Sequence, residues 1–150
     1  MSYPSTWKIT TFPVTLEGFY RGFFYAGYIQ LSKTDPSQPQ SRSDLPENTA
    51  YIQVSVGTTA LSPREFVDGD YLGRGSVYDN ISDEKLFLGY DAIKIYRTDI
   101  FPDTVLFKVS PTTFFIVTSE IYSSDSTSSL YYKKTAEEIN EILSTFKFTK

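Results

Sequence analysis

The residue types that most often carry enzyme chemistry are scarce in this 150-residue chain. It contains no Cys and no His, although it has 18 Asp and Glu residues. A Ser-His-Asp or Cys-His centre therefore cannot be assembled from this chain alone. The thiolate and imidazole ligands that transition metals prefer are missing as well. The sequence predicts no catalytic residue, no metal site and no cofactor.

The carboxylates themselves give no specific motif. Gly73-Arg74-Gly75 lacks the third glycine of a phosphate-binding fingerprint and the strand-to-helix context that such a fingerprint needs. A group of acids in one region lacks the central glycine and the alternation of a calcium loop, so we interpret it as solvated loop charge. That group is Asp68, Asp70, Asp79, Asp83 and Glu84.

Aromatic residues offer a different kind of site. The chain has 12 Tyr and 12 Phe, and several of them are concentrated in residues 19–28. Strand side chains alternate between faces, so about half of such a cluster must point away from a helix-covered core. We predict that Tyr20, Phe24 and Tyr28 are exposed and bind a protein partner, because aromatic rings are enriched in such patches. The alternative is that these rings form core and sheet margin.

Period-two patterns of β-branched and aromatic residues predict the strands that would position this patch. They lie at residues 7–12, 23–32, 50–57, 86–88 and 92–97. The Pro-rich residues 33–48 are predicted to form an exposed loop, and Gly89-Tyr90-Asp91 a turn.

The segment from Thr104 to Phe148 has the clearest pattern. It predicts a strand, a turn at Ser110-Pro111-Thr112-Thr113 and a second strand in which Phe115, Val117 and Ser119 share one face. After a Ser-rich loop at residues 123–129, Thr135-Ala136-Glu137-Glu138 predicts a capping box at the start of a helix. Apolar residues then recur at helical spacing, at Ala136, Ile139, Ile142, Leu143 and Phe146.

A second helix start lies in the middle of the chain. Ser62 is predicted as the N-cap, Pro63 as the first helical residue and Glu65 as the partner that completes a capping box. We predict that this helix ends near Gly69 or Gly73, because glycine is preferred just past a helix end.

Length and charge bound the class of protein. We predict one domain over residues 1–150, the usual number for this length. The net charge of -4 disfavours nucleic-acid binding, which normally requires a basic face. The sequence contains no apolar run long enough to span a membrane and no signal peptide. Its abrupt start suggests a segment trimmed from a longer precursor.

The order of these features resembles a known family. Tyr3-Pro4-Ser5-Thr6-Trp7-Lys8-Ile9 is similar to the YPSxWK opening of PsbP-like domains in bacterial lipoproteins. The strand at residues 51–56 and the helix at residues 62–72 resemble the family's middle section. Gly89-Tyr90-Asp91-Ala92 resembles its G-Y-E-A turn, and Glu141-Ile142-Leu143-Ser144-Thr145-Phe146-Lys147-Phe148 its usual ending.

The resemblance implies an α+β fold, the PsbP-like α/β/α sandwich, with helices on both faces of an antiparallel sheet. It implies a location outside the cytoplasmic membrane, with the membrane contacted only through a lipid anchor upstream of this segment. It also implies binding or assembly work without catalysis. The metal-binding His of some photosynthetic members has no counterpart here. The family normally has a strand before the Tyr-Pro turn, whereas almost nothing precedes Tyr3, so we expect either that the segment was trimmed or that the first strand is lost.

Three hypotheses for function follow. The first is a non-catalytic domain of a bacterial surface protein that recognises a protein partner at the cell envelope. The second is a small-molecule or ion-binding module with a pocket between the sheet and a helix. The third is a hydrolase that uses carboxylates alone.

Overall fold

The computed structural model describes residues 4–13, 19–20, 23–34, 49–68, 81–82, 87–96, 103–122 and 130–147. This part of the chain contains one antiparallel sheet and two helices. The strands are β1 (Lys8–Pro13), β2 (Phe19–Tyr20), β3 (Phe23–Thr34), β4 (Thr49–Thr58), β5 (Ile81–Ser82), β6 (Ala92–Ile95), β7 (Asp103–Lys108) and β8 (Thr113–Tyr122). The helices are α1 (Pro63–Asp68) and α2 (Leu130–Ser144).

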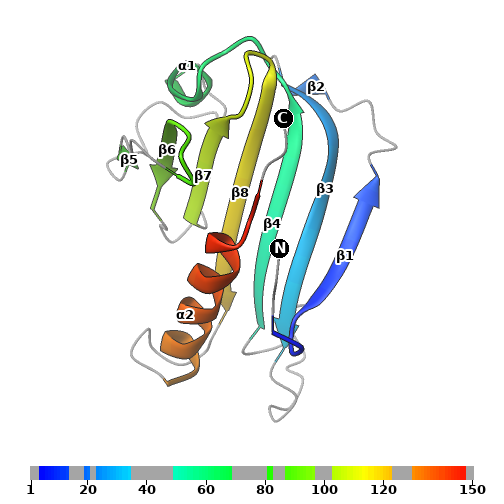
Figure 1. Ribbon diagram of the computed structural model, residues 1–150, viewed down its shortest axis with the longest axis vertical. Helices are drawn as coiled ribbons and strands as arrows, with labels where there is room; N and C mark the ends of the chain where they lie inside the picture. Colours follow the sequence, from blue (N-terminus) through cyan, green and yellow to red (C-terminus); the bar gives the residue numbers. More distant parts are fainter. Residues whose placement is uncertain are drawn as a thin grey trace.

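The sheet is built from two runs of strands that meet at β4 and β8. Its order is β1-β3-β4-β8-β7-β6-β5. Strand β2 pairs with the first two residues of β3, whereas β1 pairs with residues 27–32 of β3. The chain forms one edge with β1 to β4, crosses to the other edge, and returns through β5 to β8 (Figure 1). The pairing of β4 with β8 is continuous from Thr49↔Tyr122 to Thr58↔Thr113. This pair therefore joins the two halves of the fold.

Helix α2 covers one face of the sheet (Figure 1). Alternate residues of the strands point toward it, as the period-two patterns require. Trp7, which precedes β1, and Phe146, which follows α2, complete this core. Its buried residues are Trp7, Leu31, Ala50, Ile52, Val54, Ala92, Val105, Phe107, Val117, Ile121, Ile139, Ile142 and Phe146.

Helix α1 lies against the opposite face, over the end of β6 and β7. Its capping box is confirmed: the Glu65 amide donates to Ser62 Oγ at 3.1 Å, and the Ser62 amide donates to Glu65 Oε2 at 2.8 Å. These contacts with Ser62 lower the pKa of the Glu65 carboxyl. Phe66 packs its ring 4.8 Å from that of Phe114, between ring centroids. The smaller core on this face consists of Phe66, Val67, Ile93, Ile95, Leu106, Phe114 and Ile116.

The predicted α/β/α sandwich is wrong, and the fold is a sheet-dominated α+β arrangement. Helix α1 has six residues, which is less than two turns, so it cannot form a layer over the sheet. Farther along this face, β4 and β8 carry polar, half-buried residues such as Gln53 and Thr118. A face of this kind does not need a helix to remove apolar surface from water. The predicted helix ends at Gly69 and Gly73 lie outside the described residues.

The predicted capping box at Thr135 is also wrong. Helix α2 begins at Leu130, so Thr135 lies inside the helix, and its side chain is fully buried against the sheet. Its hydroxyl has no hydrogen-bond partner among the residues that the structure describes. The helix continues toward its N-terminus because Tyr131 and Tyr132 extend the apolar stripe and pack against the core.

Glu138, the other end of the predicted box, instead connects three distant segments. Its Oε2 accepts a hydrogen bond from the Trp7 indole at 2.9 Å and from the Lys33 ammonium at 2.7 Å. The side chains of Lys33 and Glu138 are only 12% and 14% exposed. The Lys33 ammonium also lies 5.5 Å from the centre of the Tyr131 ring. This cluster holds the N-terminal segment and β3 against α2.

Most predicted strands are confirmed to within a few residues at the ends that the structure describes. At residues 87 and 88 the predicted strand is wrong, because Phe87 and Tyr90 form only an isolated bridge around a two-residue turn, and Leu86 lies outside the described residues. Strand β3 extends through Thr34, which shortens the predicted loop, and residues 35–48 lie outside the described part. The predicted hairpin is confirmed, with β7 and β8 paired from Asp103↔Ser119 to Lys108↔Phe114.

Candidate functional site

A groove of about 470 Å³ lies between α2 and the half of the sheet formed by β6, β7 and β8. The sheet forms its floor, α2 forms one wall, and the turn before β6 contributes to the rim. Its lining residues are Phe87, Leu88, Lys94, Asp103, Val105, Val117, Ser119, Glu120, Ile121, Tyr132, Ala136, Ile139, Asn140, Leu143 and Ser144.

The floor of the groove contains polar residues at positions that normally belong to a core. Val105 and Val117 are directly paired, and both are buried on the α2 side of the sheet. Strand alternation places Asp103 and Ser119, which are also paired with each other, on the same side. Lys94 is on this side too, because it pairs with Val105. A strand face beneath a helix is normally apolar, so these three polar residues distinguish the groove from the rest of the core.

The charged residues of the floor are held by their surroundings. The Lys94 ammonium lies 4.9 Å from the centre of the Tyr96 ring, within the range of a cation–π contact. Lys94 and Asp103 are both half-buried, and both make contacts within the protein. Opposite charges are therefore presented side by side on a partly desolvated surface.

The wall formed by α2 leaves space because one of its groove-facing residues is small. Tyr132, Ala136, Ile139 and Leu143 follow helical spacing and lie on one face of α2. The methyl group of Ala136 leaves room between larger neighbours before and after it. Asn140 is exposed at the outer edge of this wall and supplies an amide. The wall is thus apolar inside and polar at its margin.

The turn at the rim has an unusual backbone. Leu88 and Gly89 have φ angles of 52° and 87°, and Phe87 and Tyr90 exchange backbone hydrogen bonds of 2.9 and 3.0 Å. Positive φ at both central residues is the pattern of a type I′ turn. The left-handed conformation costs a non-glycine residue about 1–2 kcal/mol. The fold accepts this cost at Leu88, which is where the turn presents a large apolar side chain to the groove.

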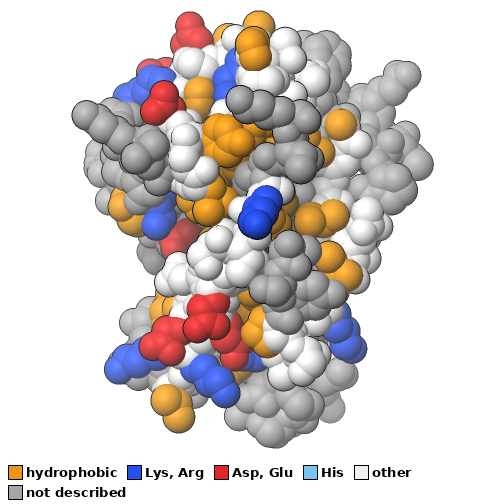
Figure 2. Space-filling model, viewed as in Figure 1, with side chains coloured by type: hydrophobic (Ala, Val, Ile, Leu, Met, Phe, Trp, Pro, Cys, Tyr) orange, Lys and Arg blue, Asp and Glu red, His pale blue; other side chains and the backbone are white. Residues whose placement is uncertain are grey.

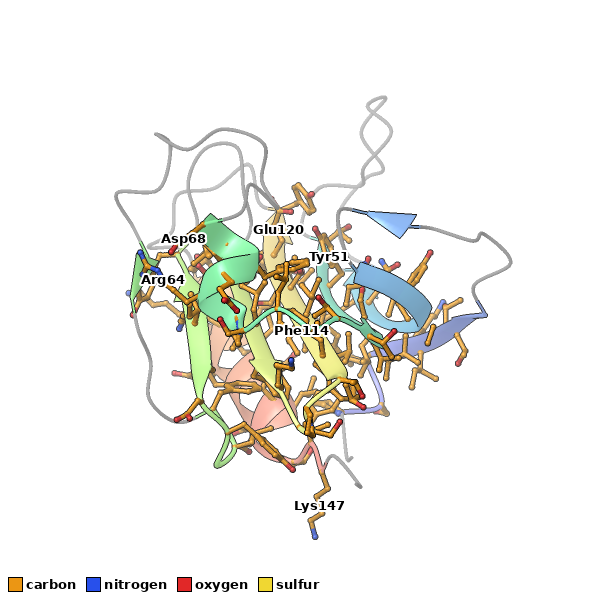
Figure 3. All side chains as sticks on the ribbon, turned by 90° about the horizontal axis from the view of Figure 1, so that it is seen from above. Tyr51, Arg64, Asp68, Phe114, Glu120 and Lys147 are labelled. Carbon is orange, nitrogen blue, oxygen red and sulfur yellow. The ribbon has the colours of Figure 1, made fainter. Side chains whose placement is uncertain are left out.

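A second polar cluster lies on the opposite face of the sheet. The Tyr51 and Tyr122 hydroxyls both donate to Glu120 Oε2, at 2.9 and 2.6 Å. Burial and the contact with Glu120 raise the pKa of the Tyr51 hydroxyl, which therefore remains a donor at neutral pH. Figure 3 shows Tyr51 and Glu120 on the α1 side of the sheet and Lys147 on the other. This cluster satisfies its own donors and acceptor, as a structural network does.

Figure 2 shows the distribution of side chains on the α2 side of the molecule. Charged residues gather on the outer surface of α2, and hydrophobic residues gather above the helix. Several rings on this side belong to the core: Phe107 packs against Phe87, Tyr90 and Phe115, with centroid distances of 5.2, 5.8 and 5.5 Å. Phe107 itself is fully buried, so these rings stabilise the sheet.

The structure places the predicted binding patch at the other edge of the sheet, away from the groove. Tyr20 is in β2, and Phe24 and Tyr28 are in β3. Tyr28 is half-buried and pairs with Ser55, whereas the side chains of Tyr20 and Phe24 lie outside the described part. A β-bulge between Tyr25 and Gly27 interrupts the alternation that the prediction assumed. The patch therefore stays a prediction.

The other candidate sites from the sequence give no centre. Asp68 is exposed and accepts a hydrogen bond from Arg64 at 2.9 Å. Figure 3 labels both residues, on α1. The remaining acids of that group and Gly73-Arg74-Gly75 lie outside the described residues. Within the described ranges, no three acidic residues lie close enough together to hold a metal ion. Nor is any described helix long and apolar enough to cross a membrane.

The second hypothesis from the sequence included a pocket between the sheet and a helix, but it named none of the residues that line this groove, although part of the signal was present. The period-two pattern places Ser119 on one face with Phe115 and Val117, and a polar residue in that apolar series marks the floor. The same alternation places Asp103 in line with Val105 and Phe107. Lys94 gives no such signal, because its position depends on the pairing of β6 with β7.

The fold and the groove define a class of protein: an antiparallel-sheet domain with a partly open, mixed polar and apolar groove beneath one helix. Comparisons with family models, with characterised proteins and with solved structures found no match to this chain. Membership of the PsbP-like family therefore stays a prediction from the sequence motifs.

Proposed function

We propose that this protein is a non-catalytic binding domain that takes a small organic molecule into the groove beneath α2. The observation that carries the proposal is the volume of about 470 Å³ combined with the polar floor formed by Lys94, Asp103 and Ser119. Small-molecule sites usually measure about 300–1,000 Å³ and combine an apolar lining with a few polar groups that fix orientation. The groove has both properties.

The chemistry of the chain supports binding over catalysis. The sequence supplies no imidazole or thiol, so the commonest general bases and nucleophiles are not available within it. Recognition of a protein partner at the cell envelope, and anchoring outside the cytoplasmic membrane, remain predictions of the family resemblance. Of the three aromatic residues on which that recognition rests, only Tyr28 has a described side chain.

The proposal can be tested by screening a library of uncharged and charged fragments by two-dimensional NMR. Binding in the groove shifts the backbone amides of Val105, Val117 and Ser119. Ala136→Trp places an indole in the space left by the alanine and should abolish these shifts. Ala60→Trp is the matched control, because Ala60 is exposed and does not line the groove.

Two results would contradict the proposal. One is that no fragment shifts the amides of the groove floor at millimolar concentration. The other is that fragments bind equally well to wild type and to a folded Ala136→Trp variant. If overpacking at this position prevents folding, Ser144→Trp serves instead, since Ser144 is exposed at the end of α2 and lines the groove.

A further inference from the structure

We propose that the ligand of the groove is a zwitterion, specifically an α-amino acid with an apolar side chain. This inference rests on the proposed function, and it adds the chemical class of the ligand. It is drawn from three properties of the groove: one charge of each sign on the floor, their spacing on neighbouring strands, and an apolar surface beside them.

The first property is the balance of charge. Lys94 and Asp103 are the two ionisable residues whose side chains strand alternation directs into the groove. Glu120 also lines it, but its carboxylate is on the opposite face, where it accepts from Tyr51 and Tyr122. A ligand with one charge would complement one floor residue and approach the other with like charge. A zwitterion complements both.

The second property is the spacing of the two charged residues. Lys94 is directly opposite Val105, and Asp103 is two residues before Val105 on the same strand. Diagonal neighbours of this kind have Cα atoms about 7–8 Å apart in an antiparallel pair. The long, flexible Lys94 side chain closes part of this distance. An ammonium and a carboxylate carried by one carbon atom can therefore contact Asp103 and Lys94 together.

The third property is the apolar surface next to the charges. Val105 and Val117 form the floor between the strands, and Ile139 and Leu143 face them from α2. An aliphatic or aromatic side chain bound here would remove apolar surface from water on both sides. Both charged residues already make contacts in the protein, so they are held in place before the ligand arrives.

The experiment uses three probes that share one apolar body. These are L-leucine, the amine 3-methylbutan-1-amine and the acid 4-methylpentanoate, titrated separately and followed by NMR on the groove amides. L-leucine should bind at least about tenfold more tightly than either singly charged probe, because each lost hydrogen bond to a charged group removes that much affinity or more. L-phenylalanine, with its amine and acid counterparts, forms a second series with a larger body.

Two variants then assign each charge. In Lys94→Met, which keeps the length of the side chain, L-leucine should lose its advantage over the amine. In Asp103→Asn, it should lose its advantage over the acid. Lys134→Met and Asp91→Asn are the matched controls, because both residues are exposed and neither lines the groove. Both controls should keep the wild-type order of affinities.

The outcomes separate this inference from the proposed function. If all three probes bind alike, or if neither amino acid binds while library fragments do, the zwitterion inference is overturned and the groove remains a binding site. If Lys94→Met and Asp103→Asn leave the order of affinities unchanged, the assignment of the two charges is overturned as well. If no probe and no fragment enters the groove, the proposed function fails together with the inference.

Discussion

Replacing Glu138 by Gln should destabilise the protein at neutral pH and much less in acid. Glu138 Oε2 accepts hydrogen bonds from the Trp7 indole and the Lys33 ammonium at 2.9 and 2.7 Å. The amide of Gln can still accept one of these bonds, but it leaves Lys33 without a counter-charge at a site where that side chain is 12% exposed. Exposed ion pairs contribute about 0–1 kcal/mol, and breaking a buried pair costs about 3–5 kcal/mol. We expect a loss of about 2 kcal/mol, between these two ranges.

The pH dependence follows from the pKa of Glu138. Burial by itself would raise this pKa, but the hydrogen bonds from Lys33 and Trp7 and the positive charge of Lys33 outweigh burial, so the pKa lies below its ordinary value of 4.5. A depressed pKa contributes stability that is present above the unfolded-state value and is lost as the pH falls through the folded-state value. The difference in the free energy of unfolding between wild type and Glu138→Gln should therefore have its full size at neutral pH. It should shrink as the pH falls below 4.5, the ordinary pKa of a Glu carboxyl.

Urea denaturation at a series of pH values measures this difference directly. Glu141→Gln is the matched control, because Glu141 is exposed on the same helix and should change stability little at any pH. The assigned role of Glu138 in the cluster would be refuted by a difference that stays constant from neutral to strongly acidic pH. It would also be refuted by a loss below about 0.5 kcal/mol at neutral pH, the range of ordinary surface substitutions.

Three further substitutions test other parts of the structure. Thr135→Val should raise the melting temperature by about 2–4 °C in a thermal scan, because it removes a buried hydroxyl that has no partner among the described residues. Gly89→Ala should lower the free energy of unfolding by about 1 kcal/mol in chemical denaturation. The φ angle of Gly89 is +87° and an added Cβ meets nothing within 4 Å, so only backbone strain opposes the substitution. An unchanged free energy of unfolding would contradict the left-handed turn. Ile142→Ala should lower the free energy of unfolding by about 2–5 kcal/mol, as buried large-to-small changes do. The control Leu130→Ala should lower it little, because Leu130 is 82% exposed. Equal losses in the two variants would mean that α2 is not docked as described.

The features that sequence reasoning predicted correctly depend on neighbouring residues. The Ser62 and Glu65 capping box joins residues three apart, and the β7–β8 hairpin joins strands separated by a short turn. Thr135 and Glu138 show the limit of such reasoning, because they match the capping-box pattern in the interior of a helix. Glu138 instead contacts Trp7 and Lys33, which are far away in the sequence, and Thr135 is buried against the sheet. No local pattern contains that information.

The residues of the candidate site divide in the same way, into those that a local pattern places and those that depend on distant parts of the chain. Alternation along one strand was enough to place Ser119 and Val117 on one face. The groove, however, requires β6 to pair with β7 and α2 to cross above them, so Lys94 and Asp103 meet only in the assembled fold. The sandwich, which the family resemblance implied, failed because the helix that follows Ser62 has only six residues, and a helix start says nothing about how long the helix will be. Helix length depends on how much apolar sheet surface remains to be covered.

The pairing of β4 with β8 has a consequence for the order in which the ribosome delivers this chain. When β4 emerges, only β3 is available to it, and its other edge has no strand to pair with until β8 is synthesised. Its apolar residues Ile52 and Val54 also wait for α2, which follows β8. The nascent chain therefore exposes an unpaired strand edge between the synthesis of β4 and that of β8, and such edges readily join other chains. We expect the central sheet to form only after β8 is available, with aggregation of any truncated product that ends before Thr113.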